Sequence, residues 1–246
     1  MKIYKYRALS PGDDSLGRVE RIVRRRAVWC AAPASLNDCE EFAWNCDFTV
    51  SPHTNELLAD LLVKLKGWPS AVARELSRGA LEQGKLPDVA GPVIDEMIQT
   101  ARAEAGVASF GTSADNAILW KRYGGDGAGV CIELDVPDSA LGQRFHRVVY
   151  DDRRTIHVDD FLRSRFDRRY AAVVYCTLLT KTTYWAPEQE VRFLSKRQGL
   201  EVVIEDAAVT GVVVGQHVAE DDRERIQSVA GSALVVRRSR EGENAA

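Results

Sequence analysis

The sequence predicts an α+β fold with a mixed β-sheet core and an inserted helical segment. Three observations support this prediction. Short runs near the start, the middle and the end of the chain alternate or cluster apolar residues, as strands do. Residues 54–104 instead repeat apolar side chains at helical spacing, and turn-forming residues separate the runs. We therefore expect one domain over residues 1–246, with 54–104 as a helical insertion or lid.

Composition limits the classes of protein that the chain can belong to. Its 246 residues are 45% hydrophobic and 28% charged, as in ordinary globular proteins, and a net charge of -3 gives no general attraction to nucleic acid or anionic membranes. No stretch reaches the roughly 18 apolar residues of a membrane span, so we expect a cytoplasmic protein. The five scattered cysteines and four histidines show no metal-ligand spacing, so we expect no metal.

The first third of the chain begins with strand and turn signals. Ile3–Arg7 alternates aromatic or apolar residues with basic ones and predicts a strand. Leu16–Arg26 has the apolar spacing of a short helix, and the apolar run Val28–Ala32 predicts a second strand that Pro33 ends. Asn37 follows in a polar, turn-rich loop.

Residues 54–104 predict three helices. The first is capped near Thr54 and ends at Gly67, the second begins at Ser70, and the third opens at Pro92, since proline is favoured in a first helical turn. We find no chemistry-bearing pattern in this segment.

The middle of the chain returns to strands. Gly106–Ser113 predicts a strand, and Asn116 can cap a short helix over Ala117–Tyr123. The glycine-dense loop Gly124–Gly129 precedes the strand Val130–Val136, which is the wrong order for a Walker-type phosphate loop. We interpret it as a tight turn, with phosphate binding by its backbone amides as the alternative.

The remaining chain alternates strands and helices. Strands are expected at Arg147–Asp152, Glu201–Ile204, Val209–Val214 and Leu234–Val236, and helices at Val158–Leu179 and Ala219–Val229.

The most informative stretch is KTTYWAPEQEVRFL, Lys181–Leu194. On a strand, Glu188, Glu190 and Arg192 would share one face while the apolar residues between them point into a core. One cation and two aromatic residues precede them: Lys181, Tyr184 and Trp185. Two close acids repel unless a cation intervenes, so an Arg–Glu ladder on a solvated sheet face is the structural alternative to a catalytic pair.

Five stretches carry a resemblance to a bacterial family. They are YKYR at Tyr4–Arg7, VWCAAPASLNDCEEF at Val28–Phe42, SFGTSADNAILWKRYGGDGAGVCIELD at Ser109–Asp135, VVY at Val148–Tyr150 and KTTYWAPEQEVRF at Lys181–Phe193. In this order the chain resembles the family catalogued as domain of unknown function 2971. The family's usual Phe and Pro in the second stretch are replaced by Leu36 and Cys39, while Asn37, Asp38 and Phe42 keep the pattern. The family name supplies no reaction.

A second, remote resemblance concerns layout. A tyrosine-rich basic strand at the start, small hydroxyls on a middle strand and a late Glu-x-Glu also look like the layout of ADP-ribosyltransferases, including DNA-modifying toxins. This resemblance implies a split sheet, NAD as substrate, and transfer of ADP-ribose to nucleic acid or protein. It also implies a toxin or phage-defence effector with a neutralising partner.

The resemblance implies a role for each candidate residue. Glu190 would stabilise the positive charge that develops on the ribose as the nicotinamide bond breaks, and Glu188 would orient the acceptor or take its proton. Candidates to stack on rings or hold the dinucleotide are Lys5, Tyr6, Arg7, Asn37, Ser109, Trp120, Tyr123, Lys181, Trp185 and Arg192.

Two other classes of function stay open. In the first, the same residues bind a nucleotide or a partner protein without turnover, as in a sensor or effector domain. In the second, Asp38, Glu188 and Glu190 hold magnesium in a nuclease, because that metal prefers carboxylate ligands.

Overall fold

The computed structural model describes all residues except 11–13, 37–44, 167–176, 233 and 240–246. Helices and several small sheets occur together, which confirms the predicted α+β class. The chain divides into two compact units. Unit 1 comprises Met1–Ala32, Ala105–Val148 and Tyr184–Ala246, and unit 2 comprises Pro33–Glu104 and Val149–Thr183.

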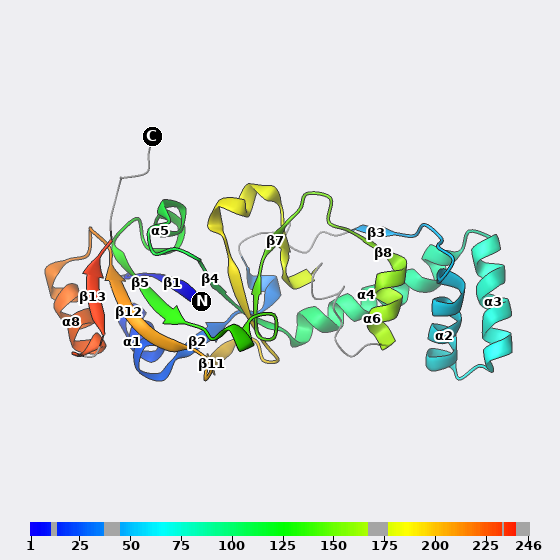
Figure 1. Cartoon of the computed structure of the whole chain (residues 1–246), viewed down its shortest axis with the longest axis horizontal. Coiled ribbons are helices and arrows are strands. Elements are labelled where there is room, and N and C mark those ends of the chain that lie inside the picture. Colours follow the sequence, from blue (N-terminus) through cyan, green and yellow to red (C-terminus); the bar gives the residue numbers. More distant parts are fainter. Residues whose placement is uncertain (11–13, 37–44, 167–176, 233, 240–246) are drawn as a thin grey trace. The chain divides into compact units, whose positions relative to one another are not determined.

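Unit 1 contains most of the strands (Figure 1). Its elements are β1 (Lys2–Ala8), α1 (Ser15–Arg25), β2 (Ala27–Cys30), β4 (Gly106–Phe110), α5 (Ala117–Tyr123), β5 (Gly129–Asp135), η2 (Asp138–Ala140), β6 (Phe145–Arg147), η3 (Thr183–Glu188, from its second residue on), β10 (Val191–Ser195), β11 (Leu200–Val203), β12 (Ala208–Val214), α8 (Glu220–Ala230) and β13 (Val235–Arg238).

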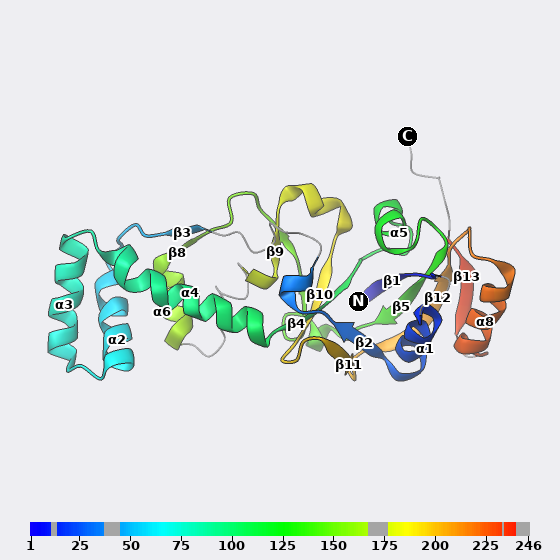
Figure 2. The same ribbon diagram turned by 180° about the vertical axis from the view of Figure 1, so that it is seen from behind.

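The four-stranded sheet of unit 1 has the order β1-β5-β12-β13, with only the β12–β13 pair parallel. Alternation along β1 directs Ile3 into a core with α1 and α8, and Tyr6 to the opposite face, where α5 packs. Figure 2 shows α1 and α8 as neighbours beside this sheet. The sheet is therefore covered by helices on both faces.

A second sheet of unit 1 has the order β4-β10-β6 and is antiparallel. Val191 and Phe193 of β10 join Phe110 and Phe145 in the same core as Ile3. The edge of β1 also meets the residue after β4, through two backbone hydrogen bonds between Tyr4 and Gly111. The start of β10 is thus held close to β1 by a shared core and by β4.

Unit 2 is mainly helical. Its elements are η1 (Pro33–Ser35), β3 (Asn45–Asp47), α2 (Thr54–Lys66), α3 (Ser70–Glu82), α4 (Leu86–Glu104), β7 (Val149–Tyr150), β8 (Thr155–His157), α6 (Val158–Phe166) and β9 (Thr180–Lys181). A core of its own joins residues of α2 and α4 with Val158, Phe161 and Leu162 of α6. The helical segment 54–104 therefore packs against α6, and its action as a lid stays a prediction.

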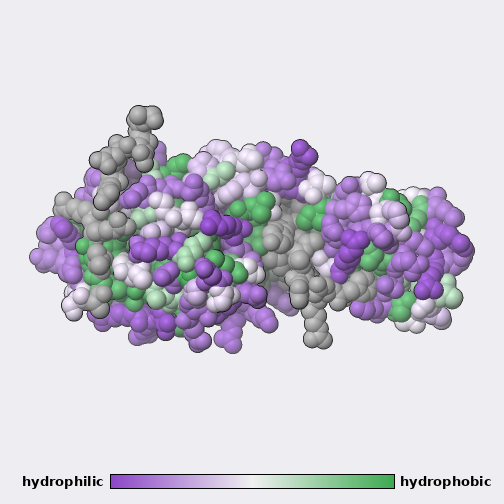
Figure 3. All heavy atoms as spheres, viewed as in Figure 1, coloured by the Kyte–Doolittle hydropathy of each residue, from purple (hydrophilic) through white to green (hydrophobic). Residues whose placement is uncertain are grey.

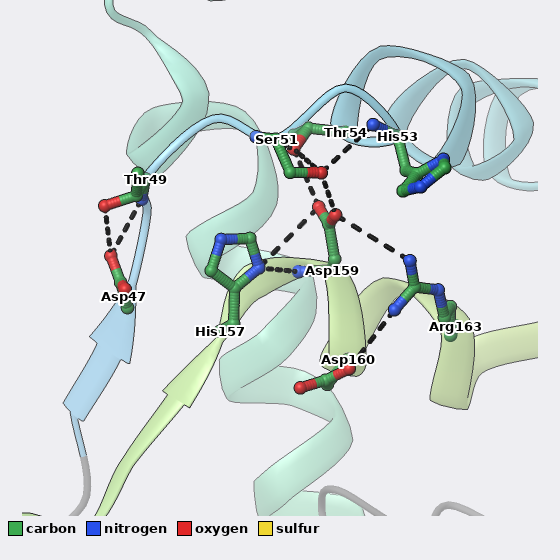
Figure 4. Close-up of polar contacts among 9 residues, drawn as sticks. All are labelled: Asp47, Thr49, Ser51, His53, Thr54, His157, Asp159, Asp160 and Arg163. Atoms are coloured by element: carbon green, nitrogen blue, oxygen red, sulfur yellow. Dashed lines mark hydrogen bonds and ion pairs between the residues drawn. The ribbon is translucent and has the colours of Figure 1, made fainter.

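A buried carboxylate connects the first turns of α2 and α6 (Figure 4). Asp159 is 3% exposed and accepts hydrogen bonds from the hydroxyls of Ser51, at 2.5 Å, and Thr54, at 2.7 Å. Its own backbone N–H donates to Nδ1 of His157 at 3.2 Å, and Arg163 lies 4.0 Å from the carboxylate. No local pattern indicates this network, because its hydroxyls lie more than 100 residues from Asp159.

Several predicted boundaries change. The third helix begins at Leu86 and contains Pro92, so the prediction that it starts at this proline was wrong. Proline removes one backbone hydrogen bond, and the burial of Ile94, Met97 and Ile98 along the same helix offsets that loss. Gly67 ends α2 in the left-handed conformation with φ 66°, as expected. The long helix predicted from Val158 is described only as α6, because 167–176 lie outside the described residues.

Figure 3 shows hydrophilic side chains over most of the visible face of both units, with apolar side chains in small patches. Among the described residues, no helix combines the length and the apolar character needed to cross a membrane.

Candidate functional site

The Glu-x-Glu segment does not lie on a strand. Glu188 ends the 3-10 helix η3, and β10 begins only at Val191, which corrects the prediction that both acids share a strand face. Pro187 lies within η3, and Gln189 adopts a left-handed conformation with φ 47° and donates its N–H to Ala186 at 3.1 Å. The two acids therefore lie in different backbone settings, Glu188 at the end of η3 and Glu190 just before β10.

Glu190 forms a buried ion pair with Arg192. Nε of Arg192 lies 2.8 Å from Oε1 and a terminal nitrogen 3.4 Å from Oε2 of Glu190. Arg192 is 1% exposed and Glu190 is 5% exposed. Because both carboxylate oxygens engage the guanidinium, the pair presents a dipole instead of an isolated negative charge.

Glu188 is held by a different guanidinium. It is 2% exposed and accepts hydrogen bonds from Nη1 of Arg122 at 2.9 Å and from the Tyr123 hydroxyl at 3.1 Å. The hydrogen bond from Arg122 to Glu188 raises the pKa of the Arg122 guanidinium, which therefore stays charged. The Tyr123 hydroxyl thus contacts the acid, whereas the sequence predicted a ring that stacks on a ligand.

Two residues at this position were missed by sequence reasoning as site residues, Arg122 and Tyr184. The guanidinium of Arg122 lies 4.4 Å from the Trp185 ring centroid and 5.6 Å from that of Tyr184. Arg122 directly precedes Tyr123 on the short helix, and Tyr184 directly precedes Trp185. Their position beside predicted candidates was the only signal, since the pairing of Arg122 with Glu188 joins residues 66 apart in sequence.

The capping residue of α5 positions this cluster. Asn116 accepts backbone hydrogen bonds from Ile118 at 3.0 Å and Leu119 at 3.2 Å, as its sequence position predicted. Its side-chain amide also donates to the backbone oxygen of Pro187 at 2.8 Å. One side chain therefore fixes both the start of α5 and the end of η3.

Lys5 lies on the same side of β1 as Ile3 and donates to the backbone oxygen of Ser109 at 2.7 Å. Burial, and then the charge of Arg7, lower the pKa of the Lys5 ammonium to about 7, although Glu190 acts in the opposite direction. Ser109 is followed on β4 by Phe110, which pairs with Val191, the residue after Glu190, so Lys5, Ser109 and Glu190 lie near one another in unit 1.

Arg7 lies two residues further along the same face of β1. Burial, and then the charge of Arg18, lower the pKa of its guanidinium, while Glu201 acts in the opposite direction. Within the described part of the chain, Nε of Arg7 is buried and has no hydrogen-bond partner. A buried donor of this kind is rare in proteins and is often satisfied by water or a bound anion.

Tyr6 and Trp120 belong to the core under α5. They are 6% and 8% exposed, and their rings meet edge to face with centroids 5.1 Å apart. The Tyr6 hydroxyl donates to the backbone oxygen of Ser113 at 2.7 Å, and Nε1 of Trp120 donates to that of Ala114 at 2.8 Å. Burial raises the pKa of the Tyr6 hydroxyl. Their burial argues against the predicted role in stacking on a ligand, and they hold α5 on the sheet instead.

The predicted site residues divide between the units. Unit 1 contains Lys5, Tyr6, Arg7, Ser109, Trp120, Tyr123, Trp185, Glu188, Glu190 and Arg192. Lys181 belongs to unit 2, where it is 5% exposed, and Asn37 and Asp38 lie outside the described residues. Across the described ranges, no group of three or more His, Cys, Asp or Glu side chains has the geometry to hold a metal ion.

Comparison with models of protein families gives no match, and comparisons with curated proteins and with solved structures give no significant match.

Proposed function

We propose that unit 1 binds an anionic nucleotide, without turning it over, through the cations of β1. The observation that carries the proposal is the division of charge at the site. Both acids of the Glu-x-Glu segment already hold a guanidinium, while Lys5 donates to a neutral carbonyl oxygen. Lys5 and the nearby Arg7 both have pKa values lowered mainly by burial. Among the described residues neither cation forms an ion pair, and a diphosphate would supply negative charge in direct contact with both.

The lowered pKa of Lys5 gives this proposal a pH signature. An anion beside the ammonium raises its pKa, so binding takes up a proton when the free protein has lost it. With a free pKa of about 7, a ligand that fully protonates Lys5 binds about 25-fold more weakly at about pH 8.5 than at about pH 6.5. A site that does not involve Lys5 would lack this dependence.

The experiment measures how NAD and ADP-ribose shift the melting temperature and how tightly they bind by calorimetry at the two pH values. A ligand that prefers the native state must stabilise it, by about 2.7 kcal/mol at 100 times Kd. Lys5→Met should remove the pH dependence, and Lys2→Met, on the same strand but exposed and paired with Glu133, should keep it. Failure of folded wild-type protein to bind either ligand would rule out the proposal.

ADP-ribosyl transfer is the second candidate, and one observation favours it. Three predicted elements of the transferase layout lie together in unit 1. Lys5 of the basic strand donates to the backbone oxygen of Ser109 on β4, and Glu190 directly precedes β10, which pairs with β4. The layout supports an ADP-ribosyltransferase-like split sheet. In that function Glu190 stabilises the oxocarbenium-like ribose, and a nucleic acid or protein accepts the ADP-ribose.

Release of nicotinamide distinguishes the two candidates. The binding proposal expects none from the wild type in cell extract, and no labelled ADP-ribose on nucleic acid or protein. The wild type could instead release nicotinamide while Glu190→Gln, folded by circular dichroism, does not. That result would refute the binding proposal and support the transferase.

A further inference from the structure

Tyr184 is an exposed aromatic residue with a fixed orientation. Tyr184 is 70% exposed, compared with 47% for Trp29 and 37% for Trp68. The ring meets Trp185 edge to face, with centroids 5.3 Å apart and an interplanar angle of 89°. Single exposed apolar residues are common, so exposure alone does not indicate a ligand. The groups behind this ring carry the argument.

Arg122 holds the aromatic pair from behind. Its guanidinium lies on the Trp185 ring at 4.4 Å from the centroid and 5.6 Å from that of Tyr184. One terminal nitrogen donates to the Tyr184 hydroxyl at 3.4 Å, and the other binds the buried Glu188 at 2.9 Å. The rings of Tyr184 and Trp185 and the guanidinium of Arg122 therefore contact one another. The buried Glu188 holds the guanidinium in place.

The backbone under Tyr184 is also constrained. η3 contains Pro187, whose ring fixes φ, and the oxygen of Pro187 accepts the hydrogen bond from Asn116. A ring that is already ordered loses little conformational entropy when a ligand stacks on it. Such preorganisation is what a stacking site requires.

We propose that Tyr184, supported by Trp185 and Arg122, is a stacking site for a base of single-stranded nucleic acid. Every base has a flat π-face, and stacking on an exposed aromatic ring is independent of sequence. Glu188 offsets the charge of Arg122, so stacking carries most of the affinity, and the exposed Lys121 on α5 supplies one cation for a backbone phosphate. The site requires neither NAD binding nor chemistry at Glu190.

The test is binding of a fluorescently labelled oligothymidylate by anisotropy at low and moderate salt. Tyr184→Ala should weaken binding about 5- to 100-fold, the range that loss of one stacked base gives. Tyr184→Phe should keep most of the binding, because it keeps the ring and its contacts with Trp185 and Arg122 and loses only the hydrogen bond to the hydroxyl. Trp29→Ala removes another exposed aromatic side chain of unit 1 and should have no effect. Salt should change the affinity only slightly.

Three results would overturn the proposal: no binding by the wild type, equal binding by Tyr184→Ala, or an equal loss in Trp29→Ala. Each variant is first checked for an unchanged melting temperature. The NAD measurements on Tyr184→Ala separate this inference from the proposed function. If Tyr184→Ala loses oligonucleotide binding but keeps the NAD response, the loss is specific to the stacking site. If no protein responds to NAD, only the proposed β1 site is refuted.

Discussion

Replacing Lys5 with methionine tests the electrostatics of the site directly. In the folded protein, burial and Arg7 lower the pKa of this ammonium to about 7 from an ordinary value of 10.5. Between these two values the unfolded chain carries the proton on Lys5 and the folded chain does not. The stability of the wild type therefore rises as pH increases from about 7, and the cost of the buried charge is fully present below that pH.

The size of the effect follows from the two pKa values. Between about pH 7 and pH 9 the contribution of Lys5 to the free energy of unfolding rises by about 2 kcal/mol. Above this window Cys30 acts in the opposite direction, because burial raises the pKa of its thiol to about 11 and the unfolded chain loses that proton first. The window from pH 7 to 9 is therefore the informative one.

The assay is urea denaturation followed by tryptophan fluorescence at several pH values. Lys5→Met should lower the slope of stability against pH by about 1 kcal/mol per pH unit relative to wild type. Lys2→Met is the control, since the ordinary pKa of Lys2, 10.5, lies above the window and the hydrogen bond to Glu133 raises it further. Parallel curves for wild type and Lys5→Met would show that the Lys5 ammonium is solvated, and the argument for an anion site on β1 would fail with it.

Three further predictions concern stability. Arg192→Met should destabilise unit 1 by about 3–5 kcal/mol in urea denaturation, because it leaves Glu190 buried without its guanidinium. Adding Glu190→Gln should recover much of this loss, and strictly additive losses would contradict a coupled pair. Asp159→Ala should lower the free energy of unfolding by about 2–4 kcal/mol, since two hydroxyls lose their acceptor. Asp160→Ala, at the exposed neighbour, should change the unfolding midpoint little, and equal effects of the two substitutions would refute the network. Asn116→Ala should cost about 1–2 kcal/mol by calorimetry, and an unchanged melting temperature would show that α5 does not need its cap.

Local signals in the sequence predicted much of the fold. The alternation in β1, the largely apolar strand β5, the glycine that ends α2 and the cap of α5 each depend on residues close in the chain. Pro92 misled because packing of the same helix outweighs one lost hydrogen bond, and such packing is not visible in a local pattern.

The site was harder to predict because its contacts are long-range. Alternation from Val191 suggested that the strand also includes Glu188. Instead, the 3-10 helix that contains Pro187 ends at Glu188, Gln189 is left-handed, and the strand begins only at Val191. Tyr6 and Trp120 have both an apolar ring and a polar group, so their residue types suit a core and a ligand site equally well. Only the fold shows that their polar groups bind backbone oxygens.

The ion pair between Glu190 and Arg192 also defines what a transferase would require. A carboxylate stabilises positive charge on ribose in proportion to the negative charge it presents, and a guanidinium at 2.8 Å offsets most of it. In a transferase, a diphosphate that drew Arg192 away would expose the acid only after binding, so binding would precede any turnover. ADP-ribose carries the diphosphate without a nicotinamide to release. If it binds as tightly as NAD and nicotinamide mononucleotide does not bind, recognition lies in the diphosphate and the β1 cations, and Glu190 serves to order Arg192.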